Sequence, residues 1–339
     1  MVSLNDLFRH LPREFVDRLY RDFPAALAER ILQGMAALRP VTLRVNRLRA
    51  TPAAVREELR EQGVQTESVP WYEDALRVVT PGVRERRMAE LPAFRDGRIY
   101  LQSLASMLPP LVLDPQPGER VLDLAAAPGS KTTQMAAMMG NEGFILACEK
   151  NPIRLGRLEH NLRVQGVTIA QAVRADGATI GRRHPGEFDR VLLDAPCSGE
   201  GLFLYGRPAS YRYWTAGGVE RMAALQRRLL ASAWQALRVG GVLVYSTCTI
   251  ARAENEDVVA WALSRWGDKV ELESCRLPAA SPGGFEPGGP LLLDLLEEAV
   301  PAGTGGGAGA YPAAVQNAVR ILPSPDMEGF FIARLRKRG

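Results

Sequence analysis

Residues 121–132 read VLDLAAAPGSKT, which predicts a β-strand, a turn of small residues and the start of a helix. Small residues in such a turn let the backbone approach a ligand closely, and the first turn of the helix presents free N–H groups. The glycine spacing G-x-G-x-x-G is absent, which argues against a nicotinamide dehydrogenase. Taken alone, the stretch fits a tight structural turn equally well.

The stretch opens a longer pattern in which apolar strands alternate with helical segments. We expect strands at about 119–124, 143–149, 168–174, 188–194 and 241–247. Apolar residues at helical spacing fill the gaps, most clearly at 152–164 and 217–238. This alternation predicts an α/β fold with a mostly parallel sheet. Residues 276–312 are rich in Gly, Pro and Ala and are interpreted as a flexible insertion, after which residues 329–335 form a closing strand.

The first part of the chain has a different pattern. Residues 1 to about 100 are interpreted as a separate α/β domain, and residues 101–339 as the larger domain. Four arginines cluster around the first strand of the N-terminal domain, at Arg39, Arg44, Arg47 and Arg49. They form either a solvated face or a contact surface for the phosphates of a nucleic acid.

Apolar runs and a helix-capping residue predict the order of elements in the N-terminal domain. After a helical opening, residues 41–46 predict a strand. Thr51 is a favourable N-cap, Pro52 suits the first helical position, and the helix is expected to run to Gln62. A strand that ends at Val69 completes a small β-α-β arrangement.

The composition is that of a globular protein, with 46% hydrophobic and 24% charged residues. No apolar run approaches the ~20 residues that a membrane-spanning helix needs, and the N-terminus lacks the pattern of a signal peptide. We therefore expect a cytoplasmic enzyme. The net charge of +4 permits a polyanionic partner without requiring one.

Acids and thiols follow the predicted strands at the end where open α/β sheets bind ligands. They are Glu149, Asp176, Asp194, Cys197 and Cys248. Two thiols at adjacent strand ends suggest covalent catalysis, because a thiolate is the best protein nucleophile near neutral pH.

The other two of the four cysteines, Cys148 and Cys275, are interpreted as small buried hydrophobic residues. Since no cysteines pair as C-x-x-C and the chain has three histidines, we expect no metal site.

Several motifs resemble the Nop/Sun family of RNA cytosine-5 methyltransferases, and most closely its bacterial branch that modifies small-subunit ribosomal RNA. The resemblance covers the whole chain and is carried by residues 121–132, by DRVLLDAPCSGEG at 189–201 and by YSTCT at 245–249. Further matches are Gln102 with Ser106, VPW at 69–71, ENE at 254–256 and GFFIA at 329–333.

The resemblance implies a class I methyltransferase with a Rossmann-like, mostly parallel seven-stranded sheet and a small N-terminal RNA-binding domain. It also implies S-adenosylmethionine as the cofactor, with the turn around its methionine part, Glu149 at the ribose and Asp176 at the adenine. The cofactor-binding residues that it implies are Ala125, Ala126, Ala127, Pro128, Gly129, Ser130, Lys131, Glu149, Arg154, Asp176 and Asp194.

The family mechanism implies a role for each catalytic residue. Cys248 adds to carbon 6 of cytosine, which makes carbon 5 reactive toward a methyl donor. Asp194 hydrogen-bonds the cytosine N3 and amino edge, and Cys197 assists release of the methylated base. Lys131 lies among these groups, where its charge can lower the pKa of a thiol.

The chain departs from the family pattern with Ala125 in place of Cys, Ser130 in place of Gly and Ser103 at a commonly acidic position. Relatives that modify ribosomal RNA often carry a further C-terminal RNA-binding module, and this chain stops at Gly339, so transfer RNA is the alternative substrate. A DNA cytosine-5 methyltransferase would use Cys197 as nucleophile and leave Cys248 idle. A non-catalytic ribosome-assembly factor would keep the fold alone. We expect a monomer.

Overall fold

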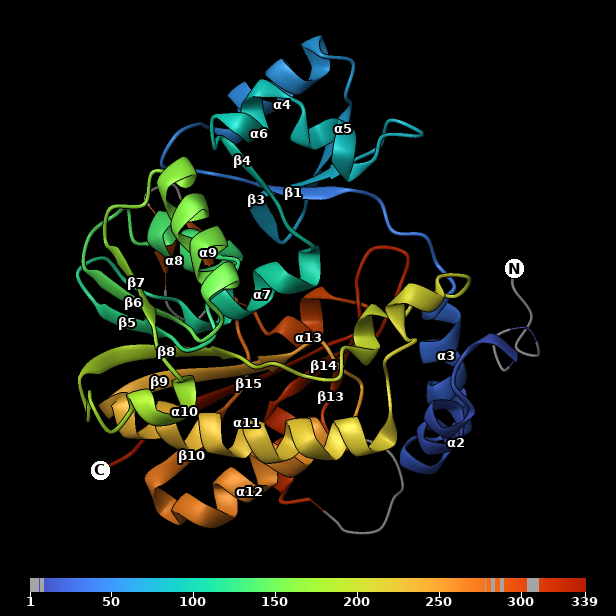
Figure 1. Cartoon of the computed structure of the whole chain (residues 1–339), viewed down its shortest axis with the longest axis vertical. Helices are drawn as coiled ribbons and strands as arrows, with labels where there is room; N and C mark the ends of the chain where they lie inside the picture. The colour runs from blue at the N-terminus through green and yellow to red at the C-terminus, as the bar shows by residue number, and fades with distance from the viewer. Residues whose placement is uncertain (1–5, 7–8, 278, 282–283, 287–289, 304–310) are drawn as a thin grey trace.

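The computed structural model describes residues 6, 9–277, 279–281, 284–286, 290–303 and 311–339 (Figure 1). A four-stranded sheet near the N-terminus lies above a nine-stranded sheet that runs through the larger part of the molecule. None of the helices in these ranges is both long and apolar enough to span a membrane.

The large sheet contains the predicted parallel strands in the order β7-β6-β5-β8-β9. Their bounds are β5 (Arg120–Asp123), β6 (Phe144–Glu149), β7 (Ala170–Arg174), β8 (Phe188–Asp194) and β9 (Leu237–Thr247). The closing strand β15 (Phe330–Lys337) runs antiparallel to β9, and β10 (Val270–Glu273) pairs with the end of β15. These seven strands confirm the predicted sheet, and β13 (Ala299–Pro301) and β14 (Val319–Ile321) extend it along β15.

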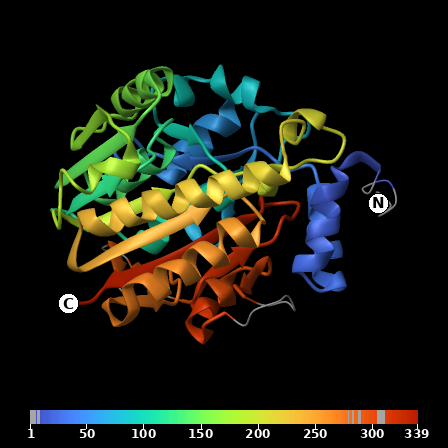
Figure 2. The same cartoon turned by 60° about the horizontal axis from the view of Figure 1, so that its bottom comes forward.

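Helices cover both faces of the large sheet (Figures 1 and 2). On one face lie α7 (Leu104–Leu113) and α8 (Ser130–Met138), and on the other α11 (Ala216–Ala236) and α12 (Glu256–Trp266). Alternate residues of a strand point to opposite faces. Val191 and Leu193 of β8 accordingly pack with α11, whereas Leu192 packs with α7. The central strands are therefore apolar on both sides, as in a buried parallel sheet.

The helix after β6 has a capping residue at each end. Helix α9 (Pro152–Gln165) begins after Asn151, whose side chain accepts hydrogen bonds from Ile153 N and Arg154 N. It ends at Gly166, which has a φ of 73° and so adopts the left-handed conformation that favours glycine. The short α10 (Gly177–Ile180) follows β7 and is capped by Asp176.

The small sheet has the order β2-β3-β1-β4, and neighbouring strands in it are antiparallel. Its strands are β1 (Thr42–Val45), β2 (Thr66–Val69), β3 (Tyr72–Val78) and β4 (Ile99–Leu101). Between β1 and β2 lies α4 (Pro52–Glu61), and α5 (Glu85–Ala89) and α6 (Pro92–Arg95) follow β3. The Thr51 side chain caps α4, as predicted.

The β-α-β prediction has the right order but misses that β3 lies between β1 and β2 and that β4 completes the sheet. Strand β3 reads YEDALRV, in which the acidic Asp74 is buried, so its apolar alternation is weak.

The first two described helices, α2 (Arg13–Asp22) and α3 (Ala25–Met35), pack away from the small sheet (Figures 1 and 2). Their apolar residues, such as Phe15 and Ile31, form a core with Phe203, Tyr211 and Ile250 of the larger part. The N-terminal helices therefore lie against the loops that follow β8 and β9.

The prediction of a flexible insertion at 276–312 is wrong for the part that the structure describes. That part contains β11 (Ala279–Ser281), β12 (Gly284–Glu286), α13 (Leu292–Leu295) and β13. Leu292 and Leu296 are buried, and β13 pairs with β14, so this part belongs to the core. Residues 278, 282–283, 287–289 and 304–310 lie outside the described residues.

Candidate active site

The two cysteines predicted to react lie side by side at the carboxyl edge of the large sheet. Strands β8 and β9 are parallel neighbours with Asp194 opposite Ser246, so the loops that follow them leave the sheet together. Cys197 and Cys248 are on these loops, and their Sγ atoms are 3.2 Å apart. Both side chains are partly exposed, whereas Cys148 and Cys275 are buried, as predicted.

The surroundings of Cys197 favour its protonated thiol. The hydrogen bond with Cys248, and then burial, raise the pKa of the Cys197 thiol well above its ordinary value. Cys197 therefore keeps its proton near neutral pH and can donate a hydrogen bond to the Cys248 sulfur.

Asp194 is held at the end of β8 by partners on two other segments. Its Oδ2 lies 2.7 Å from Lys131 Nζ, and its Oδ1 accepts a hydrogen bond from Ser246 Oγ at 2.8 Å. Lys131 also donates to Ser106 Oγ at 2.7 Å. The carboxylate is thus fixed in orientation while about a third of its side chain stays exposed, at 29%.

The position of Lys131 changes its expected role. We predicted that its charge lowers the pKa of a thiol, but the ammonium lies against Asp194 and the pKa of Cys197 is raised. The structure therefore places the charge of Lys131 on the carboxylate, and its effect on the pKa of a thiol stays a prediction.

The turn after β5 is braced from both ends. Thr132 Oγ1, in the first turn of α8, donates to Asp123 Oδ2 at the end of β5 at 2.7 Å. Gly129, which precedes the helix, has a φ of 106°, a conformation that L residues rarely adopt. Ser130 is the first residue of α8. Close backbone approach therefore depends on Gly129, and the serine that replaces the family's glycine stands in ordinary helical conformation.

The acids after β6 and β7 lie at the same edge of the sheet. Glu149 is buried, accepts from Asn151 N at 2.7 Å and lies 3.3 Å from Arg154 Nη1. Arg154 also donates to Ala127 O, which joins Glu149 to the turn. Asp176 pairs with Lys150 at 2.8 Å, and this hydrogen bond lowers the pKa of Asp176.

The predicted site residues are therefore gathered along one edge, from Asp176 through Glu149 and the turn to the two thiols. Within the described ranges, no group of three or more His, Cys, Asp or Glu side chains is placed to hold a metal ion.

The sequence matches the models of known protein families. The family model described as 16S rRNA methyltransferase RsmB/F matches residues 110–336. The chain belongs to the RsmB/F family. A second model, described as the ferredoxin-like domain of RsmF/B-like methyltransferases, matches residues 11–84. The predicted family resemblance is confirmed.

Relatives in the RsmB/F family resemble the chain over nearly its whole length. The ribosomal RNA small subunit methyltransferase F of Shewanella amazonensis is 38% identical over 341 residues, which cover 99% of this chain and 65% of that protein. The protein of the same name from Pectobacterium atrosepticum is 36% identical over 336 residues, with 97% and 63% covered. The chain thus spans slightly less than two thirds of the length of these relatives.

Solved structures confirm the methyltransferase fold with its small N-terminal domain. A methyltransferase homolog protein from Pyrococcus horikoshii is 32% identical, with a TM-score of 0.78 over 99% of this chain and 100% of that one. NSun6 from the same organism, solved with SFG, has a TM-score of 0.78 over 98% and 100% of the two chains. At 23% identity, the second likeness shows the fold alone.

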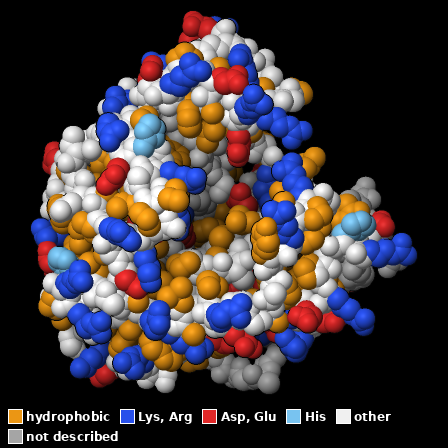
Figure 3. Space-filling model, in the orientation of Figure 1, with side chains coloured by type: hydrophobic (Ala, Val, Ile, Leu, Met, Phe, Trp, Pro, Cys, Tyr) orange, Lys and Arg blue, Asp and Glu red, His pale blue; other side chains and the backbone are white. Residues whose placement is uncertain are grey.

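A cleft of about 660 Å³ separates the small sheet from the larger part of this RsmB/F chain, where Figure 3 shows the surface hollowed. Arg84 and Arg86 line it from the small sheet's side, and Arg207 lines it from the loop after β8. Ser103, also in the lining, precedes α7, whose Ser106 binds Lys131. The cleft is therefore bordered by basic side chains and lies next to the element that supports the site.

The arginines singled out in the sequence do not form one surface. Arg44 has no exposed surface; its Nε donates to Gln102 Oε1 and its Nη2 to Thr133 Oγ1. Arg39 is largely buried and donates to Ser324 O and Met327 O. Both interpretations, a solvated face and a phosphate contact, are wrong for Arg44, because the guanidinium joins the small sheet to α8. Arg47 and Arg49 are exposed.

Sequence reasoning assigned no role to several residues that support the site. Ser106 and Ser246 hold the Lys131–Asp194 pair, and Glu254 binds the residue after Cys197. Ser106 and Glu254 lie in segments that match the family, so the motif match pointed to them without showing their partners.

Proposed function

We propose that this chain transfers a methyl group from S-adenosylmethionine to carbon 5 of cytosine in RNA, in the cytoplasm, where ribosomal RNA is found. The observation that carries the proposal is the thiol pair, 3.2 Å apart, beside a fixed carboxylate at the carboxyl edge of the sheet. Membership of the RsmB/F family and relatives named for small-subunit ribosomal RNA support that RNA as the substrate.

The residues at the sheet edge fit the proposed cofactor. Glu149 is a buried acceptor for ribose hydroxyls, and Asp176 is placed at the next strand end for the adenine. The small-residue turn and the first N–H groups of α8 suit the methionine part. When bound, S-adenosylmethionine supplies an electrophilic methyl group to carbon 5.

Glu149→Ala is expected to weaken S-adenosylmethionine binding, because each lost hydrogen bond between a ribose hydroxyl and the carboxylate costs about 1.5–3 kcal/mol. Isothermal titration calorimetry of the isolated protein measures this loss. Glu159→Ala, an exposed glutamate on α9, is the matched control and should bind like the wild type. Equal affinities for the Glu149 and Glu159 variants contradict the assignment.

The chain's own residues account for the first chemical step. Cys248, as a thiolate, forms a bond to carbon 6 of cytosine, and the displaced electron pair makes carbon 5 nucleophilic. The Sγ of Cys197 is 3.2 Å from the Cys248 sulfur, so a protonated Cys197 can donate a hydrogen bond that favours the Cys248 thiolate. Asp194, held by Lys131 and Ser246, is placed to hydrogen-bond the N3 and amino edge of the base.

Release begins once carbon 5 carries its methyl group. The proton on carbon 5 passes to water, the double bond between carbons 5 and 6 re-forms, and the electron pair of the carbon–sulfur bond returns to Cys248. Cys197 donates a hydrogen bond to the departing sulfur and keeps its proton, which stabilises the Cys248 thiolate as it leaves.

The basic cleft is the proposed path of the RNA, with the N-terminal domain as an RNA-binding unit. Replacement of Arg84, Arg86 and Arg207 by Ala is expected to weaken RNA binding and to lower the salt dependence by about 0.7–0.9 in log–log slope per lost phosphate contact. Fluorescence anisotropy over a salt series measures both. The control replaces Arg13, Arg60 and Arg265, which are exposed away from the cleft lining. An equal change of slope in both triple variants contradicts the proposed path.

Bisulfite sequencing of total RNA from a deletion strain and its parent tests the substrate. We expect one or more cytosines of small-subunit ribosomal RNA to become open to bisulfite conversion in the deletion strain. Their protection from conversion should return when the gene is restored. Lost protection confined to transfer RNA identifies transfer RNA as the substrate instead.

A further inference from the structure

Glu254 is a buried carboxylate that binds the loop of one reactive cysteine directly. Its side chain has no exposed surface. Its Oε2 accepts hydrogen bonds from Ser198 N at 3.0 Å and from Gln226 Nε2 at 2.8 Å, and its Oε1 accepts from the Ser198 hydroxyl. In the described part of the chain, all three donors are neutral. The main chain and side chain of the residue after Cys197 are thus both tied to Glu254.

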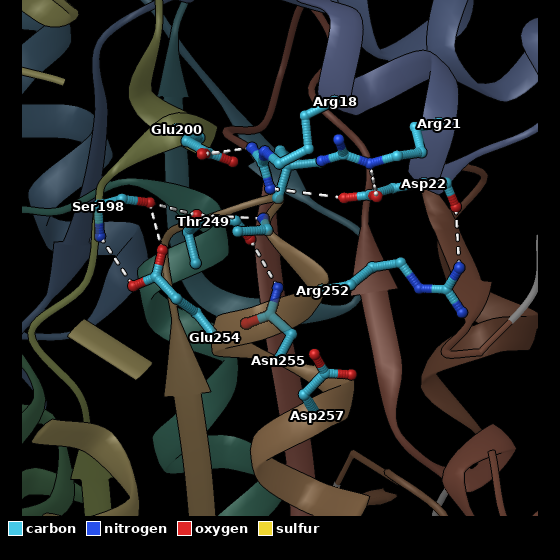
Figure 4. Close-up of polar contacts among 12 residues, drawn as sticks. Arg18, Arg21, Asp22, Ser198, Glu200, Thr249, Arg252, Glu254, Asn255 and Asp257 are labelled. Carbon is cyan, nitrogen blue, oxygen red and sulfur yellow. Dashed lines mark hydrogen bonds and ion pairs between the residues drawn. The ribbon is translucent and has the colours of Figure 1, made fainter. Parts of the chain in front are cut away.

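The same contact continues to the loop of the other cysteine (Figure 4). Ser198 Oγ lies 2.8 Å from Thr249 Oγ1, and Thr249 directly follows Cys248. Because the single Ser198 hydroxyl hydrogen points to Glu254, the Thr249 hydroxyl must donate to Ser198. Thr249 Oγ1 in turn accepts from Ala251 N at 3.2 Å. One directed chain of hydrogen bonds therefore joins both cysteine loops to Glu254.

The three hydrogen bonds suit an ionised carboxylate, which can accept from each of these donors. Burial raises the pKa of Glu254, which disfavours the charged form, yet three donors converge on its two oxygens. A glutamine amide placed at Oε2 would face two N–H donors. If the amide nitrogen took the place of Oε1, the Ser198 hydroxyl would lose its acceptor. The hydrogen bond between Ser198 and Thr249 would then have to run in the opposite direction. Glutamine is therefore similar in shape but wrong in hydrogen bonding.

We propose that Glu254 is a positioning residue that holds Cys197 against Cys248 for the release step. This inference rests on the proposed function. Ser198 directly follows Cys197 in the sequence. When Ser198 loses hydrogen bonds to Glu254, the Cys197 side chain is therefore free to move away from the departing sulfur. A shift of about 1 Å in such a group can slow a step by roughly 100-fold. The addition of Cys248 to the base is affected less, because its loop is also bonded to Glu254 through the main chain, by Glu254 N to Ala251 O, and substitution of the Glu254 or Ser198 side chain keeps that hydrogen bond.

The test compares Glu254→Gln, Ser198→Ala, Cys197→Ala and wild type, each incubated with S-adenosylmethionine and labelled RNA. Denaturing gels measure the protein–RNA adduct, steady-state assays give kcat and KM for RNA, and thermal unfolding gives Tm. Glu256→Gln is the matched control, because it makes the same change at a buried glutamate whose partner is Arg320. Ser198→Ala removes the hydroxyl's hydrogen bond to Glu254 and keeps the one from the main-chain N–H, so it tests the link with Glu254 itself intact, in case Glu254→Gln folds poorly.

We expect Glu254→Gln and Ser198→Ala to accumulate adduct, with kcat lowered about tenfold or more and KM for RNA nearly unchanged. A variant that is only less stable forms less adduct, so accumulation separates positioning from general destabilisation. Glu256→Gln should have a lower Tm without adduct accumulation. If Cys197→Ala accumulates adduct and the Glu254 and Ser198 variants do not, the positioning role is refuted. If Cys197→Ala forms none, the proposed release mechanism itself fails, and the inference with it.

Discussion

Cys248→Ser is expected to abolish methyl transfer, whereas Cys197→Ala is expected to form the covalent adduct and then stall. A serine hydroxyl is a far weaker nucleophile than a thiolate, and the Cys197 thiol beside position 248 is not a strong base that could activate it. Alanine at 197 leaves Cys248 able to add to the base but removes the thiol whose sulfur is 3.2 Å from the departing sulfur. The two thiols should therefore give opposite results.

Denaturing gel electrophoresis with labelled RNA separates these outcomes, because only a covalent adduct survives the gel. Cys197→Ala should show an adduct band, and neither Cys248→Ser nor the double variant should show one. Cys275→Ala, at a buried cysteine away from the site, is the control and should turn over normally. A DNA-type mechanism predicts inert Cys197 variants and active Cys248 variants. Normal turnover by Cys248→Ser would falsify the mechanism proposed here.

The sequence predicted the large sheet well because its strands are buried on both faces. The strands β5, β6 and β8 and the second half of β9 are short apolar runs that end in a polar residue, and such runs are recognised without knowing their neighbours. Because parallel strands end at one edge, the same pattern also brings Asp194, Cys197 and Cys248 together. Motif spacing and sheet topology thus point to the same group of residues.

The small sheet was harder to predict because its strands are short and mixed in polarity. Strand β3 carries Glu73, Asp74 and Arg77, and Asp74 is buried beside Arg47 at 3.4 Å. Arg44 is likewise buried by contacts with residues that are distant in sequence. Local patterns treat charged residues as exposed, so such long-range pairs are invisible before the chain is folded.

The residues that support the site could not be predicted from the sequence, because their partners are distant along the chain. Glu254 acts through hydrogen bonds to Ser198 and Gln226, which lie 56 and 28 residues away. The ENE motif indicated that the segment matters, but the partner of each acid depends on packing. Glu254 turns to the cysteine loops, whereas Glu256 turns to Arg320.

The buried pair of Arg320 and Glu256 is expected to contribute more to stability than any surface ion pair. Arg320 and Glu256 are each 1% exposed, and Arg320 Nη2 lies 2.5 and 2.7 Å from the two carboxylate oxygens. Arg320 Nη1 also donates to Ile250 O at 2.8 Å, and its guanidinium lies over the ring of Phe23. The pair thus joins β14, α12, the loop after β9 and the end of α2.

Arg320→Met should lower the free energy of unfolding by about 3–5 kcal/mol, because it leaves the Glu256 charge buried without its partner. Urea denaturation followed by circular dichroism measures the loss. Arg338→Met is the matched control, since Arg338 and Glu271 are half-exposed and such pairs contribute about 0–1 kcal/mol. The double variant Arg320→Met with Glu256→Met should recover much of the loss, because no unpaired charge then remains in the core. A loss for Arg320→Met as small as that for Arg338→Met would show that water reaches Glu256, and that the pair does not hold these four segments together.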